Sequence, residues 1–209
     1  MPSSNVVPAP SINGVESDYE RRILLATPED TARGLFFNGV LSAVTTLGGE
    51  TARKDCLAQL NDKRFERRFT DFASYPVSDF LRLALAATRV LTPKFGGAVA
   101  TQPRLGMQAT SDFLNSMAGR TLLLLSGDSP KRLIGNLASG YRSAVSYGER
   151  IVSMESDTSA RVLMKRDFML PHYNEGVLRA LLESVHAKSP QVRSRPLGQL
   201  DCEYELSWS

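Results

Sequence analysis

The periodicity of apolar residues changes near Gly148, and this change limits the folds that the chain can adopt. Before Gly148, apolar residues recur at every third or fourth position, which is the spacing of an amphipathic helix. After it, side chains of different character alternate over residues 151–155 and again over 162–166, with the turn-rich segment Ser156–Ser159 between them. Alternation on both sides of a short turn predicts a β-hairpin.

The residues after the hairpin complete a sheet. Pro171 is expected to begin a helix, because proline suits the first helical turn and apolar residues follow at helical spacing. Residues 192–195 and 202–208 then predict two more strands, which gives the order strand-strand-helix-strand-strand. Since helices come first and strands last, we predict an α+β fold with an N-terminal multi-helix layer followed by a four-stranded antiparallel sheet.

The segment TPEDTARGLFFNGVLSAVTTLGG, residues 27–49, predicts the first buried helix. Thr27 is a favourable N-cap, and Pro28 suits the first helical position. Gly34 is expected to kink or restart the helix. The apolar stripe that follows it ends at Gly48–Gly49, which is a common C-terminal signal.

Further helices are expected between this segment and Gly148. They cover residues 50–60, the segment from Ser78 to Thr92–Pro93, a bent helix that begins at Gly96–Gly97, and residues 130–145 after the N-cap Ser129. The apolar run Thr121–Leu125 fits either a short buried helix or a strand.

Residues 1–18 lack periodicity and contain three prolines among serines and asparagines, so we predict a flexible N-terminal tail there. No internal repeat is visible. Residues 19–209 are expected to form a single α+β domain, because a hydrophobic content of 42% is enough for one sizeable core.

Charge and apolar run length limit the partners. The chain has 25 basic and 22 acidic residues, and a surplus of +3 is not the clustered basic surface that a phosphate backbone requires. Nucleic-acid binding is therefore not favoured. The longest apolar run, Leu83–Ala87, is too short to span a bilayer, and no secretory signal is visible. We expect no membrane insertion and a cytoplasmic location.

Four ordered segments carry a resemblance to a known family. They read EDTARGLFFNGVLSAVTTLGGE, PVSDFLRLALAATRVL, SGYRSAVSYGERIV and DCEYELSW, and they are spread over nearly everything after the predicted tail. In these segments the chain resembles a myxobacterial paralogous family of uncharacterised proteins of similar length. The resemblance implies no activity, substrate or catalytic residue.

The order of elements is also distantly similar to the haem-nitric-oxide-binding and vinyl-reductase-like ligand-binding superfamily. The matching positions are Gly34–Phe36 at a helix and Tyr141–Ser143 before the closing sheet. In the haem-binding branch a mid-chain histidine ligates the iron, and a Tyr-x-Ser-x-Arg motif holds the propionates. This chain has only His172 and His186, both late, and lacks the motif. The resemblance thus implies a ligand-binding fold, but haem is not supported and no cofactor is expected.

Two groups of residues are the candidates for a ligand pocket. Phe36 and Phe37 lie on the first buried helix, and Tyr141, Arg142 and Tyr147 precede the hairpin. Tyrosine–arginine pairs bind anionic or planar ligands through stacking and forked hydrogen bonds. The pairs available among Tyr141, Arg142, Tyr147 and Arg150 can also tie a helix end to the sheet that follows it, so a purely structural role stays open.

Ser129, Lys131 and Arg132 are candidates for an anion site. They stand at a helix start, where free backbone N–H groups lie beside two basic side chains. Helix capping by Ser129 explains the same residues without any ligand.

Arg64, Arg67 and Arg68 alternate with aromatic residues, as on some nucleic-acid-binding or partner-binding surfaces. The aromatic residues Phe65 and Phe69 have helical spacing, so a core face beside a solvated arginine face is the other interpretation.

His172 is the candidate acid–base group, with Tyr173 or Asp167 as its assistant. A corner residue that hydrogen-bonds the backbone is the alternative. Because His172 and His186 lie far apart, without a nearby cysteine or glutamate pattern, no metal site is predicted. Cys56 and Cys202 form no C-x-x-C pair.

No paired catalytic constellation is visible in a chain that can build a full core. We therefore expect a non-catalytic, signalling-type ligand-binding or protein-interaction domain with an unknown small molecule or protein partner. Related ligand-binding folds often dimerise, so a homodimer is expected by analogy. The two alternatives are an enzyme that uses His172 and a nucleic-acid- or anion-binding protein that uses the arginines near Phe65.

Overall fold

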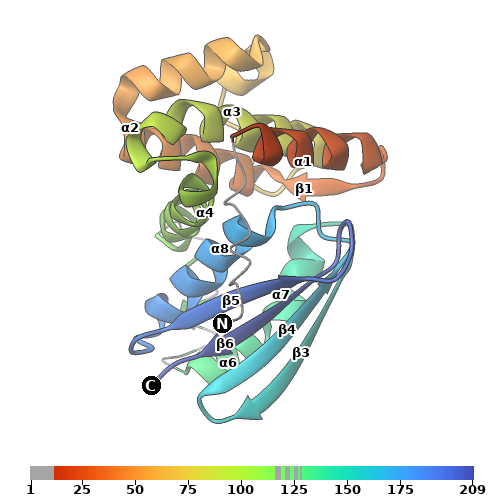
Figure 1. Ribbon diagram of the computed structural model, residues 1–209, viewed down its shortest axis with the longest axis vertical. Coiled ribbons are helices and arrows are strands. Elements are labelled where there is room, and N and C mark those ends of the chain that lie inside the picture. Colours follow the sequence, from red (N-terminus) through yellow and green to blue (C-terminus); the bar gives the residue numbers. More distant parts are fainter. Residues whose placement is uncertain (1–11, 116–118, 121–122, 125–126, 128) are drawn as a thin grey trace, which may run out of the picture.

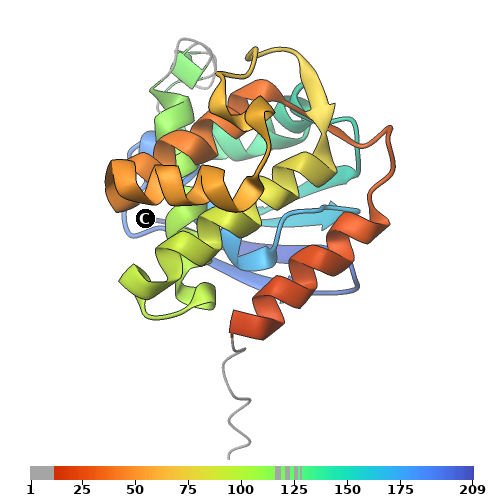
Figure 2. The same cartoon turned by 90° about the horizontal axis from the view of Figure 1, so that it is seen from above.

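A computed structural model describes residues 12–115, 119–120, 123–124, 127 and 129–209 (Figure 1). Helices come first, and a four-stranded antiparallel sheet closes the chain, so the predicted α+β fold is confirmed. Figure 1 shows the helical layer above the sheet, with one helix of the C-terminal half between them. From above, the N-terminal helices cross over the sheet (Figure 2).

The helical layer consists of α1 (Ile12–Leu25), α2 (Gly34–Leu60), α3 (Val77–Phe95) and α4 (Ala98–Leu114). A 3-10 turn, η1 (Lys63–Glu66), and two short antiparallel strands, β1 (Thr31–Arg33) and β2 (Ser74–Pro76), connect them.

The sheet consists of β3 (Glu149–Ser156), β4 (Ser159–Lys165), β5 (Gln191–Pro196) and β6 (Cys202–Ser207) in the order β3-β4-β6-β5. Helix α8 (Pro171–Ser184) runs between the two hairpins, as the order strand-strand-helix-strand-strand predicted. Two short helices, α6 (Pro130–Gly135) and α7 (Leu137–Ala144), pack against β3, and α6 also packs beside α8.

The alternation in the strands places one face of the sheet in the core. Val162, Met164 and Tyr204 point inward and are fully buried, whereas Arg161 and Glu205 alternate with them and are exposed. The inward residues pack on the apolar faces of α6, α7 and α8. A separate cluster fills the helical layer, and Val177 of α8 packs against both clusters. Helix α8 therefore joins the two layers.

The first buried helix begins at Gly34 and not at Thr27, so that prediction was wrong. Thr27 and Asp30 form a turn, in which the Asp30 carboxylate accepts hydrogen bonds from the Thr27 backbone N–H, at 2.8 Å, and from its hydroxyl. Asp30 is buried and also bonds Arg166 next to the sheet, 2.8 Å between Nη2 and Oδ2. This long-range ion pair outweighs the local preference of threonine and proline for a helix start.

The end predicted for the first helix is confirmed by the backbone. Gly49 has φ 80° and ψ 179°, which breaks α2 into two helical pieces. Glycine adopts this conformation at little cost, because it has no Cβ. The second piece covers the predicted helix over residues 50–60.

The flexible tail predicted to reach Asp18 is too long, because α1 begins at Ile12. Val15 and Tyr19 are buried, and the Tyr19 hydroxyl donates a 2.8 Å hydrogen bond to Gln102 of α4. The apolar positions of α1 are too few for a clear helical pattern, so packing against α3 and α4 decides its structure.

Two other boundaries differ from the sequence prediction. Helix α3 continues through Thr92–Pro93 to Phe95 and ends at Gly96, whose φ is 75°. The predicted helix over residues 130–145 is two helices, because Asn136 has φ −89° and ψ −2°. The run Thr121–Leu125 lies largely outside the described residues. No helix of the described part is both long and apolar enough to cross a membrane.

Candidate functional site

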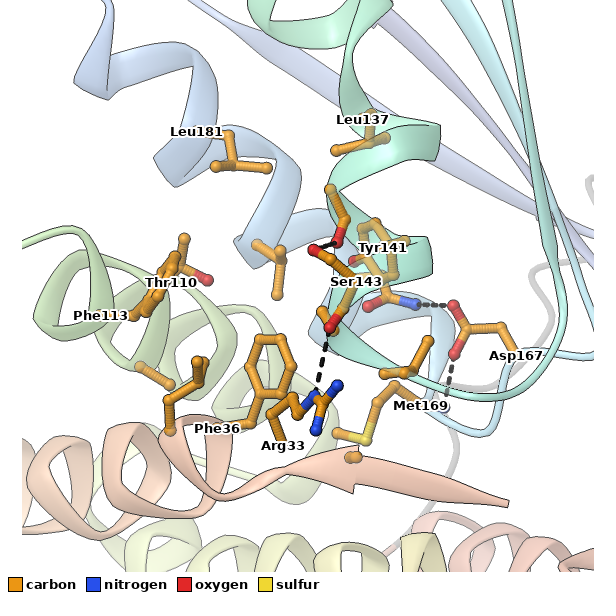
Figure 3. Close-up of a pocket in the computed structure, with 18 of the residues that line it drawn as sticks. Arg33, Phe36, Thr110, Phe113, Leu137, Tyr141, Ser143, Asp167, Met169 and Leu181 are labelled. Atoms are coloured by element: carbon orange, nitrogen blue, oxygen red, sulfur yellow. Dashed lines mark hydrogen bonds between the residues drawn. The ribbon is translucent and has the colours of Figure 1, made fainter. Parts of the chain in front are cut away.

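A cavity of about 460 Å³ lies between the helical layer and α7 and α8 (Figure 3). Its walls come from both layers: β1 and α2 on one side, α4 and α8 on another, and α6 and α7 opposite. Most of the lining atoms are apolar.

One end of the cavity is aromatic and aliphatic. Phe36 of α2 points into it, with the ring of Phe113 at a centroid distance of 6.2 Å and that of Phe80 at 6.3 Å. Leu181 of α8 lies on the same side, whereas Leu137 of α7 lines the cavity above Tyr141 (Figure 3). A ligand at this end would contact apolar side chains.

The opposite end is polar, and Asp167 and Tyr141 lie there (Figure 3). Asn174 of α8 donates hydrogen bonds through Nδ2 to Asp167 Oδ2 and to the Tyr204 hydroxyl, each at 3.2 Å. The other Asp167 oxygen accepts the backbone N–H of Met169 at 2.9 Å. These bonds fix the carboxylate in one orientation.

Arg150 lies behind this end and balances the charge of Asp167. Its Nη2 stands 2.9 Å from Asp167 Oδ2, close enough for an ion pair although the angle is poor for a hydrogen bond, and both side chains are buried. The Arg150 guanidinium also lies over the rings of Tyr141 and Tyr147, at 4.5 Å and 5.4 Å from the centroids. The two rings and the carboxylate together stabilise the buried cation.

Three tyrosines line the cavity with hydroxyls that bond no other described residue: Tyr141, Tyr147 and Tyr173. Burial raises the pKa of each phenol, and the negative charge of Asp167 raises the pKa of Tyr141 and Tyr147 further, against the opposing effect of Arg150. All three are therefore neutral phenols at physiological pH, able to donate a hydrogen bond.

The cavity reaches the surface beside Arg33 and Phe72, both of which line it, and Phe72 is 68% exposed. The Arg33 guanidinium donates hydrogen bonds to the carbonyls of Ser143, at 3.2 Å, and Phe72, at 2.6 Å. Arg33 thus connects α7 to the loop before β2 across this opening.

The structure brings together three of the five residues predicted for a pocket. Phe36, Tyr141 and Tyr147 line the cavity. Phe37 points the other way and is fully buried, with its ring stacked on Phe69 at 4.6 Å. Arg142 is exposed on the outer side of α7 and does not line the cavity.

The residues of the predicted anion site have protein partners or solvent around them. The Ser129 hydroxyl accepts the Arg132 backbone N–H at 3.3 Å, as an N-cap does. Lys131 pairs with Asp157 at 2.7 Å, and Arg132 is exposed. Helix α6 has only six residues, so its dipole gives an anion little stabilisation.

The arginines near Phe65 are mostly paired. Arg64 bonds Asp62 at 2.7 Å and Asp79 at 2.8 Å, and Arg68 bonds Asp71 at 3.0 Å. The carboxylates cancel most of the positive charge that a phosphate backbone would need.

His172 lies outside the cavity, with its side chain 47% exposed. Its Nδ1 stands 2.8 Å from the carboxylate of Glu175, which raises the pKa of the imidazole despite partial burial. Tyr173 and Asp167, the residues predicted to assist His172, line the cavity, whereas His172 does not.

Sequence reasoning missed Asn174 and Met169 as lining residues and did not connect Asp167 with Arg150. One signal was present, because Asn174 shares a helical face with Val177 and Leu181 in an otherwise apolar stripe. A polar residue at such a position is expected to need a buried partner.

A family model described as "Protein of unknown function (DUF2378)" matches residues 25–209. The chain belongs to this family. No curated protein matches the sequence. The expected resemblance to a family of uncharacterised proteins is therefore confirmed.

Among solved structures, the fold is similar to H-NOX proteins. The unliganded Fe(II) H-NOX protein from K. algicida is 14% identical with a TM-score of 0.63, and the alignment covers 85% of this chain and 96% of that one. The Fe(II)NO H-NOX protein from S. oneidensis is 14% identical with a TM-score of 0.66, over 85% and 99%. An oxygen-binding H-NOX domain related to soluble guanylate cyclases is 10% identical with a TM-score of 0.65, and the alignment covers 85% of this chain and 95% of that one. These values confirm the expected distant similarity at the level of the fold.

The residues at the cavity do not fit haem as the resembling branch holds it. The resembling branch holds the haem iron through a histidine, and neither His172 nor His186 lines the cavity. The lining tyrosines are neutral phenols, which are poor iron ligands. Val145 stands two residues after Ser143, where the propionate motif has an arginine. No cluster of His, Cys, Asp and Glu in the described residues could hold a metal ion.

Proposed function

We propose that this chain is a non-catalytic, signalling-type ligand-binding domain whose ligand is a small, largely apolar molecule held in the cavity between the helical layer and α8. The observation that carries the proposal is a mostly apolar cavity of about 460 Å³ with a few polar groups at one end. Ligand pockets in proteins have this character and volumes of about 300–1,000 Å³. The fold supports it by analogy, because H-NOX structures with NO and with oxygen share the architecture.

A ligand in the cavity would touch both layers, which gives a route for a signal. Several contacts join the helical layer to the segments around the sheet. They include Asp30 with Arg166, Arg33 with Ser143, and the Ser146 hydroxyl, which accepts the Thr31 backbone N–H at 2.8 Å. Filling the cavity next to these contacts would favour one relative position of the layers. A protein partner or a second copy of the chain would detect the difference. Both cysteines are free thiols, which favours a cytoplasmic location.

The test is a fluorescence titration with N-phenylnaphthylamine, a neutral dye that brightens in apolar surroundings. The matched variants are Gly140→Phe and Gly135→Phe. Gly140 lies on the face of α7 that carries Leu137 and Ala144 and lines the cavity, whereas Gly135 lies outside it. A Cβ at either position meets no atom within 4 Å, so the first side-chain carbon of either substitution has room.

We expect saturable binding to the unmodified protein and to Gly135→Phe, and at least a tenfold loss in Gly140→Phe. No saturable binding to the unmodified protein, or equal binding to both variants, would contradict the proposed function.

A further inference from the structure

We infer that the cavity selects a neutral apolar molecule that carries a hydrogen-bond acceptor, such as a ketone or ester carbonyl, and binds the acceptor at the end formed by Tyr141, Tyr147 and Tyr173. This inference rests on the proposed function and names the chemical class of its ligand.

The first observation is a surplus of hydrogen-bond donors. The hydroxyls of Tyr141, Tyr147 and Tyr173 bond no other described residue. None of these oxygens is among the fully enclosed unpaired atoms of the described residues, so each keeps contact with open space. All three side chains line the cavity, which is the open space described next to them. Buried donors are normally paired, and a ligand acceptor would pair one or more of them.

The other polar groups at this end are already used. Both oxygens of Asp167 accept protein hydrogen bonds, one from Met169 and one from Asn174. The hydroxyl of Thr110, which also lines the cavity, donates to the Gly106 carbonyl at 2.8 Å. At this end, the phenols are therefore the side-chain donors left for a ligand. The Asn136 amide also lines the cavity, but it belongs to an exposed residue between α6 and α7.

The second observation is the charge balance. Arg150 and Asp167 form a buried pair of net charge zero, with Asp167 at the cavity wall and Arg150 behind it. A carboxylate ligand at this end would lose its hydration and face the Asp167 carboxylate, and the cation there, Arg150, already pairs with Asp167. The nearest cation that lines the cavity, Arg33, is engaged with two carbonyls at the opening. A neutral acceptor avoids these costs.

The third observation is the separation of the two ends. Phe36, Phe113 and Leu181 lie away from Tyr141 and Asp167 across the cavity (Figure 3). A molecule with its acceptor at one end and an apolar body at the other would match both ends in a single orientation.

The experiment compares three probes of the same shape by displacement of N-phenylnaphthylamine. They are acetylnaphthalene, isopropenylnaphthalene, in which a methylene group replaces the carbonyl oxygen, and naphthoate. The proteins are the unmodified chain, Tyr141→Phe, Tyr147→Phe, Tyr173→Phe, and the control Tyr75→Phe. Tyr75 does not line this cavity, and its hydroxyl accepts the Thr70 backbone N–H at 3.2 Å.

We expect acetylnaphthalene to bind about 3- to 10-fold more tightly than isopropenylnaphthalene, the ratio for one neutral hydrogen bond, and naphthoate to bind most weakly. At least one tyrosine variant of the cavity should lose the preference for the ketone and keep its affinity for isopropenylnaphthalene. Tyr75→Phe should keep the preference.

Two failures are distinguishable. If no probe binds, the proposed function fails and this inference fails with it. If the ketone and its isostere bind equally, if no cavity tyrosine variant changes the preference for the ketone, or if naphthoate binds most tightly, the cavity still binds ligands but the inference is overturned.

Discussion

The guanidinium of Arg150 lies 2.9 Å from the carboxylate of Asp167, and the two side chains are 2% and 4% exposed. The pair connects the start of β3 with the segment between β4 and α8, and it forms the rear of the cavity's polar end. Because neither group can reach water, each depends on the other for the charge that it carries.

The losses from removing each member of this pair, in Arg150→Met and in Asp167→Asn, should therefore not add. Arg150→Met leaves Asp167 buried without a cation, and we expect a loss of about 3–5 kcal/mol in the free energy of unfolding. The double variant Arg150→Met/Asp167→Asn should lose clearly less than the sum of the two single losses. Urea denaturation measures all three. Additive losses would show that the two charges do not depend on each other.

Helices α4 and α8 pack without room for a single extra carbon. A Cβ at Gly106 would lie 2.1 Å from the Tyr173 carbonyl oxygen, and one at Gly176 would lie 2.0 Å from that of Pro103. We expect Gly106→Ala and Gly176→Ala each to cost about 1–3 kcal/mol, or more where the backbone must shift.

The control for these variants is Gly135→Ala, because a Cβ there meets nothing within 4 Å. Alanine should stabilise this helical position by about 0.5–1 kcal/mol relative to glycine. The thermal unfolding midpoints of Gly106→Ala, Gly176→Ala and Gly135→Ala test these expected changes in stability. Equal midpoints for Gly106→Ala and Gly135→Ala would mean that the helices can move apart freely.

His172 and Glu175 should show a linked pH dependence. The Glu175 hydrogen bond raises the pKa of His172 above 6.5, so the contribution of the pair is full below pH 6.5 and is lost as pH rises through the folded-state value. Burial opposes ionisation of Glu175, but hydrogen bonds from His172 and Ser194 lower its pKa below 4.5. The stability that ionised Glu175 contributes is therefore present above pH 4.5 and is lost as pH falls through its lowered pKa.

An NMR titration of the His172 ring measures this coupling. Glu175→Gln should lower the pKa of His172, whereas the control Glu183→Gln, which removes the partner of Arg179, should not. Since the His172 side chain is 47% exposed, the effect on stability should stay below about 1 kcal/mol. A His172 pKa that is the same with and without Glu175 would contradict the pairing.

The two thiols should be inert in the folded protein. Burial raises the pKa of Cys56 to about 12, against a small opposing effect of Arg53, and burial also raises the pKa of Cys202. A disulfide reagent at neutral pH should label neither thiol until the protein is unfolded, when both react. Rapid labelling of Cys56 in the native state would mean that α2 opens locally.

The alternating strands made much of the fold predictable. Residues 151–166 and 202–208 alternate because one face of the sheet is buried, and this signal depends only on local sequence. The start of the first helix was not predictable in the same way. Thr27 and Pro28 favour a helix locally, but the bond between Asp30 and Arg166, 136 residues apart, keeps them in a turn.

The candidate site was predictable only in part, for a similar reason. Phe36 and Tyr141 could be selected because each is a large side chain on an amphipathic segment. Phe37 is adjacent and equally apolar, and only the rotation of α2 decides that it stacks on Phe69 and does not face the cavity. The balance between Arg150 and Asp167 depends on a tertiary contact, which no local pattern encodes.

The most direct measurement is methionine methyl NMR during a titration with acetylnaphthalene. Met169 lines the cavity, and Met154 lies on β3 outside it. If the cavity is the binding site, the Met169 resonance should shift saturably, the Met154 resonance should stay in place, and Gly140→Phe should abolish the shift. A Met169 resonance that does not move, or equal shifts of Met169 and Met154, would contradict ligand binding between the helical layer and α8.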